Sequence, residues 1–329
     1  IKWAQEFGLE EYPVFTQKHS TDLNYIACAR FLLTKGQAGL KAKFATHNAW
    51  TVQYIIDLQS PVKYEFQRLQ GMGEALYDQI NEKYGIPCRI YSPIGQHTEL
   101  LPYLVRRLIE NGANSSFVFQ VQDPQIPVRS LIEHPADFLI NSSISNPNVP
   151  LPSEILVDYP NSLGTEIQHD LFYFELMDSV TQFNQKTYQS CALINGLEQL
   201  SVELKEVLSP VNQQRVGQCF YADDDIIQSC INTLQSQEFT PQSLEGINQT
   251  IDKIADSLYQ HRHELIFLCM MEAGKNLQSA IDEVREAQDF CKYYSRQAQK
   301  NFAGSTILDS VTGEDNILKY RPRGTILCI

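Results

Sequence analysis

Short apolar runs alternate with amphipathic segments along the first 135 residues of the chain. Three runs resemble buried strands that pass into polar or glycine-bearing loops: KFATHNA, YEFQRLQGM and CRIYSPIG. The segments between and after them have apolar residues at helical spacing: TDLNYIACARFLL, AWTVQYIIDL, GEALYDQINEKY and ELLPYLVRRLIENG. Repeated strand–helix units predict a parallel sheet, in a barrel or a doubly wound fold. Such folds bind their ligands at the carboxyl ends of the strands.

The pattern changes after residue 141. Residues 142–164 are rich in Pro, Asn and Ser, which predicts a connector, and residues 168–205 are predicted to be largely helical. Two long helices are then expected, TPQSLEGINQTIDKIADSLYQHRHELIFLCMMEAGKN and LQSAIDEVREAQDFCKYYSRQAQKNF. Thr240 and Pro241 are expected to begin the first, and Gly274 to end or bend it. NILKYRPRGTILCI predicts a strand, a turn and a second strand.

The composition narrows the class of protein. A length of 329 residues allows two domains or parts of larger ones, and a net charge of −13 argues against a nucleic-acid-binding segment. Eight cysteines without a close pair favour reduced thiols, and there is neither a signal peptide nor an apolar run of eighteen residues. We therefore expect a cytoplasmic protein. Helical periodicity at the first residue and an apolar strand at the last lead us to expect a piece of a longer polypeptide.

Two adjacent arginines, Arg106 and Arg107, interrupt the mostly apolar segment 100–109, and Glu110 follows them. One interpretation is an amphipathic surface with ordinary helix ion pairs, worth a few tenths of a kcal/mol. The other is that two guanidinium forks bind a small carboxylate at the mouth of a barrel, with Glu110 holding one of them. Spacing alone favours the surface interpretation.

The loop FATHNAW offers a second candidate. A Thr–His pair at the end of a strand can donate hydrogen bonds to phosphate or to a flavin ring, although His47 is equally consistent with a core histidine. Gly71 and Gly73 fall short of a dinucleotide fingerprint. HRH at 261–263 lacks partners at metal-ligand spacing, and DDD at 223–225 suits the start of a helix, so neither predicts a metal site.

Taken in order, these segments resemble the bifunctional proline-utilisation flavoenzymes of the PutA family. The resemblance rests on YPVFTQKHSTDLNYIACARFLL, FATHNAWT, YEFQRLQGMGEALYD, RIYSPIGQHTELLPYLVRRLIENGANSSF, VPLPSEI, SPVNQQRVGQ, RHELIFLCMMEAGKNLQSAIDEVREAQDFCKYYSRQA and RGTILCI. It implies an α/β fold in which the C-terminal part of a (βα)8 proline dehydrogenase barrel occupies 1–135. A connector with helices at 136–205 and the N-terminal part of a Rossmann-like aldehyde dehydrogenase domain at 206–329 would follow.

The resemblance also implies substrate contacts. Arg106 and Arg107 would bind the carboxylate of L-proline, and Glu110 would orient them. Tyr91 would pack against the proline ring, with Leu69 adding an apolar contact.

Cofactor contacts are implied in the same way. Thr46 and His47 would contact FAD, and Gln67 would lie near the isoalloxazine. Thr16 and Lys18 match a segment near the adenylate end of the cofactor. Two positions depart from the family, because Gln17 replaces an arginine and Gln70 a histidine.

The implied activity is oxidation of proline to pyrroline-5-carboxylate with FAD, followed in the full-length parent by NAD-dependent oxidation of glutamate semialdehyde. Membrane quinone would accept the electrons of a homo-oligomeric protein in the cytoplasm, with peripheral attachment to the inner membrane left open. The nucleotide-binding elements and the catalytic cysteine of the second activity are expected outside this chain, so the isolated chain is predicted to be inactive. The alternative is a non-catalytic scaffold or oligomerisation segment derived from the same fold.

Overall fold

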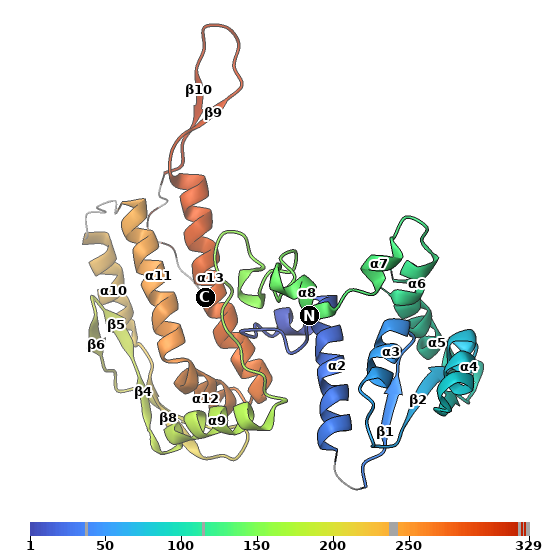
Figure 1. Cartoon of the computed structure of the whole chain (residues 1–329). Coiled ribbons are helices and arrows are strands. Elements are labelled where there is room, and N and C mark those ends of the chain that lie inside the picture. Colours follow the sequence, from blue (N-terminus) through green and yellow to red (C-terminus); the bar gives the residue numbers. More distant parts are fainter. Residues whose placement is uncertain (37–38, 114–115, 237–242, 322–323, 325, 327–329) are drawn as a thin grey trace. The chain divides into compact units, whose positions relative to one another are not determined.

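A computed structural model describes residues 1–36, 39–113, 116–236, 243–321, 324 and 326. The chain divides into two compact units (Figure 1). One is Val14–Val149, and the other combines Ile1–Pro13 with Pro150–Ile329. The domain limits predicted from the sequence stay a prediction.

The first unit, Val14–Val149, begins with helix–strand alternation and ends with short helices. Its elements are α2 (Lys18–Lys35), β1 (Ala42–Ala45), α3 (Ala49–Asp57), β2 (Tyr64–Leu69), α4 (Glu74–Tyr84), β3 (Cys88–Tyr91), α5 (His97–Gly112), α6 (Phe117–Gln122), α7 (Val128–Leu131) and α8 (Pro135–Ile140). All three predicted strands and the four predicted helices of this region are therefore confirmed.

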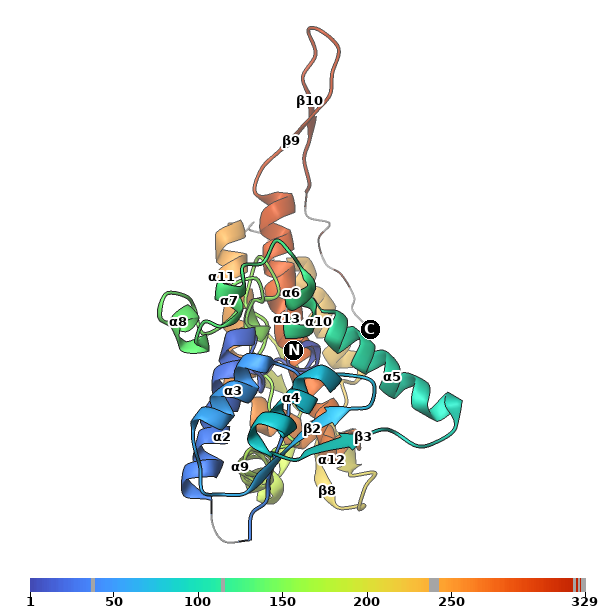
Figure 2. The same ribbon diagram turned by 45° about the vertical axis from the view of Figure 1, so that its right-hand side comes forward.

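The strands form one sheet in the order β1-β2-β3, and both pairings are parallel, as predicted. Figure 2 shows β2 and β3 side by side, with α4 nearby. Phe44 and Phe66 pack with buried residues of α2, α3 and α4 in a single core cluster, so these helices cover one face of the sheet. Because side chains alternate along a strand, Glu65, Gln67 and Leu69 lie on the opposite face. That face, at its carboxyl-terminal end, carries the candidate site.

Local sequence explains where the helices around the sheet begin and end. The side chain of Asn48 accepts hydrogen bonds from the backbone N–H groups of Trp50 and Thr51, at 3.0 and 3.3 Å, and so caps α3. Helix α4 lies between Gly73 and Gly85, whose φ angles of 66° and 65° are unfavourable for other residues. The β2–α4 turn therefore depends on glycine.

The second unit contains a helical layer and small sheets. Its elements are α1 (Lys2–Glu6), η1 (Pro152–Glu154), α9 (Asp170–Thr181), η2 (Gln182–Gln185), β4 (Tyr188–Ser190), β5 (Ala192–Ile194), β6 (Leu197–Gln199), β7 (Leu204–Leu208), β8 (Arg215–Phe220), α10 (Asp224–Ser236), α11 (Leu244–Gln260), α12 (Arg262–Glu272), α13 (Leu277–Phe302), β9 (Thr306–Leu308) and β10 (Asn316–Leu318). Helices α9, α12 and α13 share a core, and α11 packs along α13 (Figure 1). The guanidinium of Arg285 on α13 donates to the carbonyl groups of Glu6 and Ser162, which ties the chain start to this unit.

The prediction that residues 168–205 are largely helical was wrong beyond η2. Strands β5 and β6 form an antiparallel hairpin across Asn195 and Gly196, whose φ angles are 53° and 77°. Positive φ at both central residues is the conformation that Asn-Gly favours in two-residue hairpins. Strand β4 also lies in this segment and β7 begins at its end, and both pair with β8.

The prediction of one long helix up to Gly274 was also wrong, because His261, with φ −96° and ψ 12°, separates α11 from α12. Thr240 and Pro241 lie outside the described residues, and α11 begins after Ser243, whose hydroxyl accepts from the N–H of Gly246. Gly274 follows α12 with φ 67°, as a helix end requires.

The second long helix is confirmed as α13, and β10 confirms the first strand predicted in the last segment; its turn and second strand fall largely outside the described residues. Strand β9, which had not been predicted, pairs with β10 in a hairpin after α13 (Figure 2). Among the helices described, none has the length and apolar character needed to cross a bilayer.

Candidate active site

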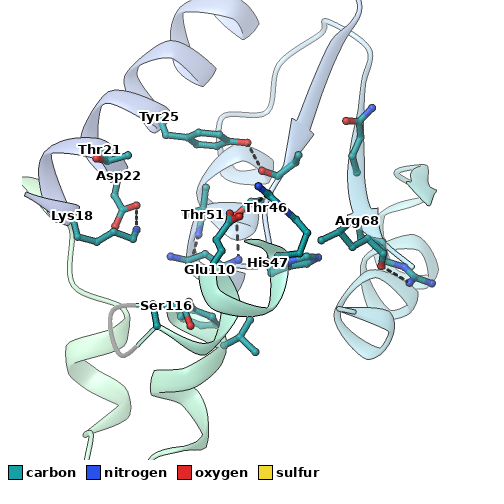
Figure 3. Close-up of a pocket in the computed structure, with 18 of the residues that line it drawn as sticks. Lys18, Thr21, Asp22, Tyr25, Thr46, His47, Thr51, Arg68, Glu110 and Ser116 are labelled. Atoms are coloured by element: carbon teal, nitrogen blue, oxygen red, sulfur yellow. Dashed lines mark hydrogen bonds and ion pairs between the residues drawn. The ribbon is translucent and has the colours of Figure 1, made fainter. Parts of the chain in front are cut away.

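A cavity of about 670 Å³ lies at the carboxyl-terminal edge of the three-stranded sheet. Helices α2, α3, α5 and α6 contribute further walls. In Figure 3, Lys18, Asp22 and Tyr25 of α2 lie on one side and Arg68 on the other, with His47 and Glu110 between them. The cavity brings together eight of the ten residues proposed from the sequence: Lys18, Thr46, His47, Gln67, Leu69, Tyr91, Arg107 and Glu110.

Helix α5 supplies the arginine and carboxylate of the cavity. A capping box starts this helix, in which the N–H of Gln96 donates to Glu99 Oε2 at 3.3 Å. Arg107 Nη1 lies 2.6 Å from Glu110 Oε2, and both residues line the cavity. Arg106 is exposed, does not line the cavity, and donates from Nε to the carbonyl of Pro102 at 3.3 Å. The two adjacent arginines therefore have different surroundings.

The loop after β1 presents Thr46 and His47. Thr46 Oγ1 accepts a hydrogen bond from the N–H of Asn48 at 3.1 Å. Burial lowers the pKa of His47; Glu110 opposes this effect and Arg68 adds to it. His47 Nε2 is buried and has no hydrogen-bond partner among the described residues. A neutral imidazole with one unused nitrogen thus borders the cavity.

Strands β2 and β3 provide the floor of the cavity. Ala45 pairs with Gln67 in the β1–β2 register, and Leu69 pairs with Tyr91 in the β2–β3 register. Paired residues of parallel strands share a face, which places Leu69 and Tyr91 next to each other. Tyr91 is 38% exposed, so its ring is accessible from the cavity.

The segment before α2 is divided between the cavity and a structural contact. Lys18 lines the cavity and forms an ion pair with Asp22. Thr16 does not line it, and its Oγ1 accepts from the N–H of Asn146 at 2.9 Å. The amide of Gln17, one of the two departures from the family, donates to the carbonyl group of Ser143 at 3.1 Å. The other departure, Gln70, donates from its backbone N–H to the carbonyl of Tyr91 at 3.1 Å.

Arg68 is a cavity residue that the sequence interpretation missed. It is only 8% exposed, and its Nη1 donates to the carbonyls of Leu69 and Met72 at 3.3 and 3.2 Å. Nη1 also lies 3.5 Å from Glu74 Oε1. The signal was present, since Arg68 shares its strand face with the buried Phe66. A charged residue at that position requires internal partners.

Comparisons with known proteins extend over the whole chain. Residues 1–120 match the proline dehydrogenase family model, and residues 198–329 match the aldehyde dehydrogenase family model. These matches agree with the predicted fold class, in which part of a dehydrogenase barrel precedes the start of an aldehyde dehydrogenase domain.

Bifunctional protein PutA of Escherichia coli (strain K12) is 34% identical over 353 residues, covering all of this chain and 25% of that protein. A PutA variant from Bradyrhizobium japonicum superposes with a TM-score of 0.79 at 36% identity, over 98% of this chain and 30% of that one. PutA from Bdellovibrio bacteriovorus, inactivated by N-propargylglycine, gives a TM-score of 0.81 at 26% identity, over 98% and 34%. The chain spans about a quarter of the length of the curated relative.

Proposed function

Because this chain belongs along its whole length to the family of bifunctional PutA proteins, we propose that its cavity binds L-proline beside FAD for oxidation to pyrroline-5-carboxylate. One observation carries the proposal: the ion-paired Arg107 and Glu110 line the same cavity as Tyr91 and His47. An anion-binding fork, an aromatic wall and a neutral imidazole are thus available to one small ligand.

Arg107 binds the proline carboxylate in this proposal. Its guanidinium presents paired N–H donors that match the two oxygens of a carboxylate, and its charge does not titrate near neutral pH. Arg106 is assigned a secondary contact, because it is exposed and its Nε is engaged by Pro102. Leu69 and Tyr91 provide adjacent apolar surface for the ring carbons.

The residues present fit a flavin. His47 Nε2 is a buried ring nitrogen without a partner in the described residues, as expected of a group that meets a ligand polar atom. Thr46 and His47 would contact the cofactor, Gln67 would lie near its isoalloxazine, and Lys18 would lie toward its adenylate end. Thr16 would act through the chain segment that it fixes to Asn146. When bound, FAD accepts the hydride removed from proline.

The contribution of this chain is binding, orientation and exclusion of water. Arg107 fixes one end of the substrate, and the side chains of Leu69 and Tyr91 limit how its ring can lie. The lowered pKa of His47 keeps its imidazole neutral at neutral pH. The ring therefore adds no further positive charge to the cavity that Arg107 lines. Holding both reactants in one orientation is the main way in which such a site accelerates transfer.

The remaining activities belong to the full-length protein in this proposal. NAD-dependent oxidation of glutamate semialdehyde to glutamate is assigned to the domain that residues 198–329 match, and no residue of this chain is assigned to its catalytic site. We further propose membrane quinone as the electron acceptor, a homo-oligomer, and a cytoplasmic location with peripheral attachment to the inner membrane.

Anaerobic addition of L-proline to the purified full-length protein tests the proposal. Bound FAD should lose its visible absorbance as it is reduced, and Arg107→Met should abolish this change at the same proline concentration. Arg129→Met, at an exposed position on α7 that does not line the cavity, is the matched control and should retain it. A protein that retains no flavin, or whose flavin proline does not reduce, would instead support the scaffold alternative.

A further inference from the structure

Two tyrosines from different helices donate hydrogen bonds to consecutive backbone carbonyls at the end of β1. Tyr25 of α2 donates to the carbonyl of Ala45 at 3.2 Å, and Tyr77 of α4 donates to the carbonyl of Thr46. Figure 3 shows Tyr25 directed toward this backbone. Sheet pairing ends at Ala45, so the ladder of β1 and β2 does not fix the carbonyl of Thr46. The hydroxyl of Tyr77 fixes this carbonyl instead, by donating a hydrogen bond to it.

The ring of Tyr77 is held firmly by its surroundings. It is 2% exposed, and its centroid lies 5.6 Å from that of Phe66 in the core. The space above Gly73 is also filled, because a Cβ added there would lie 3.1 Å from His47 Cδ2 and 3.5 Å from Tyr77 Cδ2. Gly73 thus allows the rings of His47 and Tyr77 to approach the same turn. A fixed ring makes the position of its hydroxyl well defined.

We propose that Tyr77, assisted by Tyr25, is a positioning residue that fixes the backbone of Thr46 and thereby directs His47 into the cavity. Both hydroxyls donate in these contacts. Burial raises the pKa of Tyr25 to about 12 and also raises that of Tyr77, so both keep their protons at neutral pH. The role of the loop in flavin binding rests on the function proposed above, whereas the fixing of the loop does not.

Phenylalanine variants of the full-length protein isolate the hydroxyl from the ring. Tyr77→Phe and Tyr25→Phe each remove one donor. Tyr64→Phe is the matched control. Tyr64 is the first residue of β2 and packs against the core cluster that contains Tyr77. Among the described residues, no hydrogen bond of the Tyr64 hydroxyl is found. A general loss of core stability would affect all three variants alike.

Two measurements decide the matter. Hydrogen exchange of the amides of residues 46–48, in flavin-free protein, should be about tenfold faster in Tyr77→Phe than in Tyr64→Phe, the factor expected for one net hydrogen bond. The dissociation constant for FAD, from quenching of flavin fluorescence, should rise about tenfold in Tyr77→Phe and not in the control. In Tyr77→Phe, the rate of proline oxidation at saturating FAD should fall by a smaller factor than the affinity for FAD.

Equal exchange in Tyr77→Phe and Tyr64→Phe would overturn the proposal. If the wild-type protein bound no flavin, the proposed function would fail, yet the exchange comparison would still test the positioning role. If Tyr77→Phe did not fold, Tyr25→Phe would serve in its place, because its ring is only partly buried and its hydroxyl contacts the neighbouring carbonyl. Unchanged exchange in that variant would then count against the proposal.

Discussion

Arg107 Nη1 lies 2.6 Å from Glu110 Oε2, one helical turn away on α5. The two side chains are 37% and 60% exposed, so solvent screens the pair and its contribution to folding is small, on the order of 0–1 kcal/mol. Both side chains nevertheless line the cavity that His47 and Tyr91 also line. The ion pair therefore contributes little to folding, and in the proposed function it orients the guanidinium toward the substrate.

Arg107→Lys in the full-length protein should raise the Michaelis constant for proline. Lysine keeps the charge but has no fork, so it cannot form two parallel bonds with one carboxylate. We expect an increase of roughly 30- to 150-fold, about 2–3 kcal/mol, with an unchanged melting temperature. Arg129→Lys is the control, and steady-state kinetics measures both. An unchanged Michaelis constant would assign Arg107 to the surface interpretation.

The sequence predicted the supporting frame of this site well, because its signals are local. Strand–helix alternation identified the parallel sheet, and residues at the ends of β1, β2 and β3 do meet at one edge. The partners of Arg68 could not be predicted, because Met72 and Glu74 approach it only once the β2–α4 turn has formed. The hairpin at Asn195 and Gly196 carries a local turn signal, because Asn-Gly favours two-residue hairpins, and this signal outweighs the helical spacing of the residues around it.

The two adjacent arginines illustrate the limit of sequence patterns. Neighbours on a helix point about 100° apart, so Arg106 and Arg107 cannot share one environment by helix geometry alone. Spacing did not show which of them faces the cavity, since that depends on how α5 lies over the sheet. Only the structure places Arg107 in the cavity wall and leaves Arg106 exposed.

Arg68→Met should destabilise the protein by about 1–3 kcal/mol, because it removes a buried guanidinium that donates to the carbonyls of Leu69 and Met72 and so fixes the β2–α4 turn. Arg89→Met is the matched control in the same sheet. Arg89 is 57% exposed and pairs with Glu65, so its loss should cost less than about 1 kcal/mol. Urea unfolding measures both changes. Equal destabilisation of the two variants would contradict the anchoring role of Arg68.

Acidification should destabilise the protein through His47. Burial lowers the pKa of this imidazole below 6.5 in the folded state, Arg68 adding to the shift and Glu110 opposing it. Below pH 6.5 the unfolded chain therefore binds a proton that the folded chain does not. The contribution of the neutral His47 to the free energy of unfolding is complete above pH 6.5. It declines as the pH falls and is lost once the pH passes below the pKa of His47 in the folded protein.

Melting temperatures between neutral pH and pH 5 measure this effect in flavin-free protein. His47→Asn replaces the imidazole with a side chain that does not titrate, so its melting temperature should fall less steeply with pH. The direct observation is the titration of the His47 ring by NMR, which should give a midpoint below 6.5. A midpoint above 6.5 would show that Glu110, rather than burial, controls the charge of His47.

Tyr91→Ser in the full-length protein should reduce discrimination between proline and hydroxyproline. The side chain of Tyr91 lies beside Leu69 in the β2–β3 register and lines the cavity near Arg107, where it would contact the ring of a substrate held by its carboxylate. Serine removes this apolar contact and opens room for a hydroxyl group. The ratio of the two kcat/KM values should change by about 1–3 kcal/mol, a factor of about 5 to 150, mainly because turnover of proline falls.

The competing interpretation is that Tyr91 is a structural aromatic whose loss disturbs the whole site. Its exposure of 38% argues against a core function, and burial raises its pKa without placing it in the core cluster. Tyr84→Ser, at a tyrosine of 36% exposure on α4 that does not line the cavity, controls for removal of a surface ring. A preserved melting temperature with a changed ratio supports contact with the substrate. If the ratio is the same in Tyr91→Ser, Tyr84→Ser and the wild type, Tyr91 does not face the substrate.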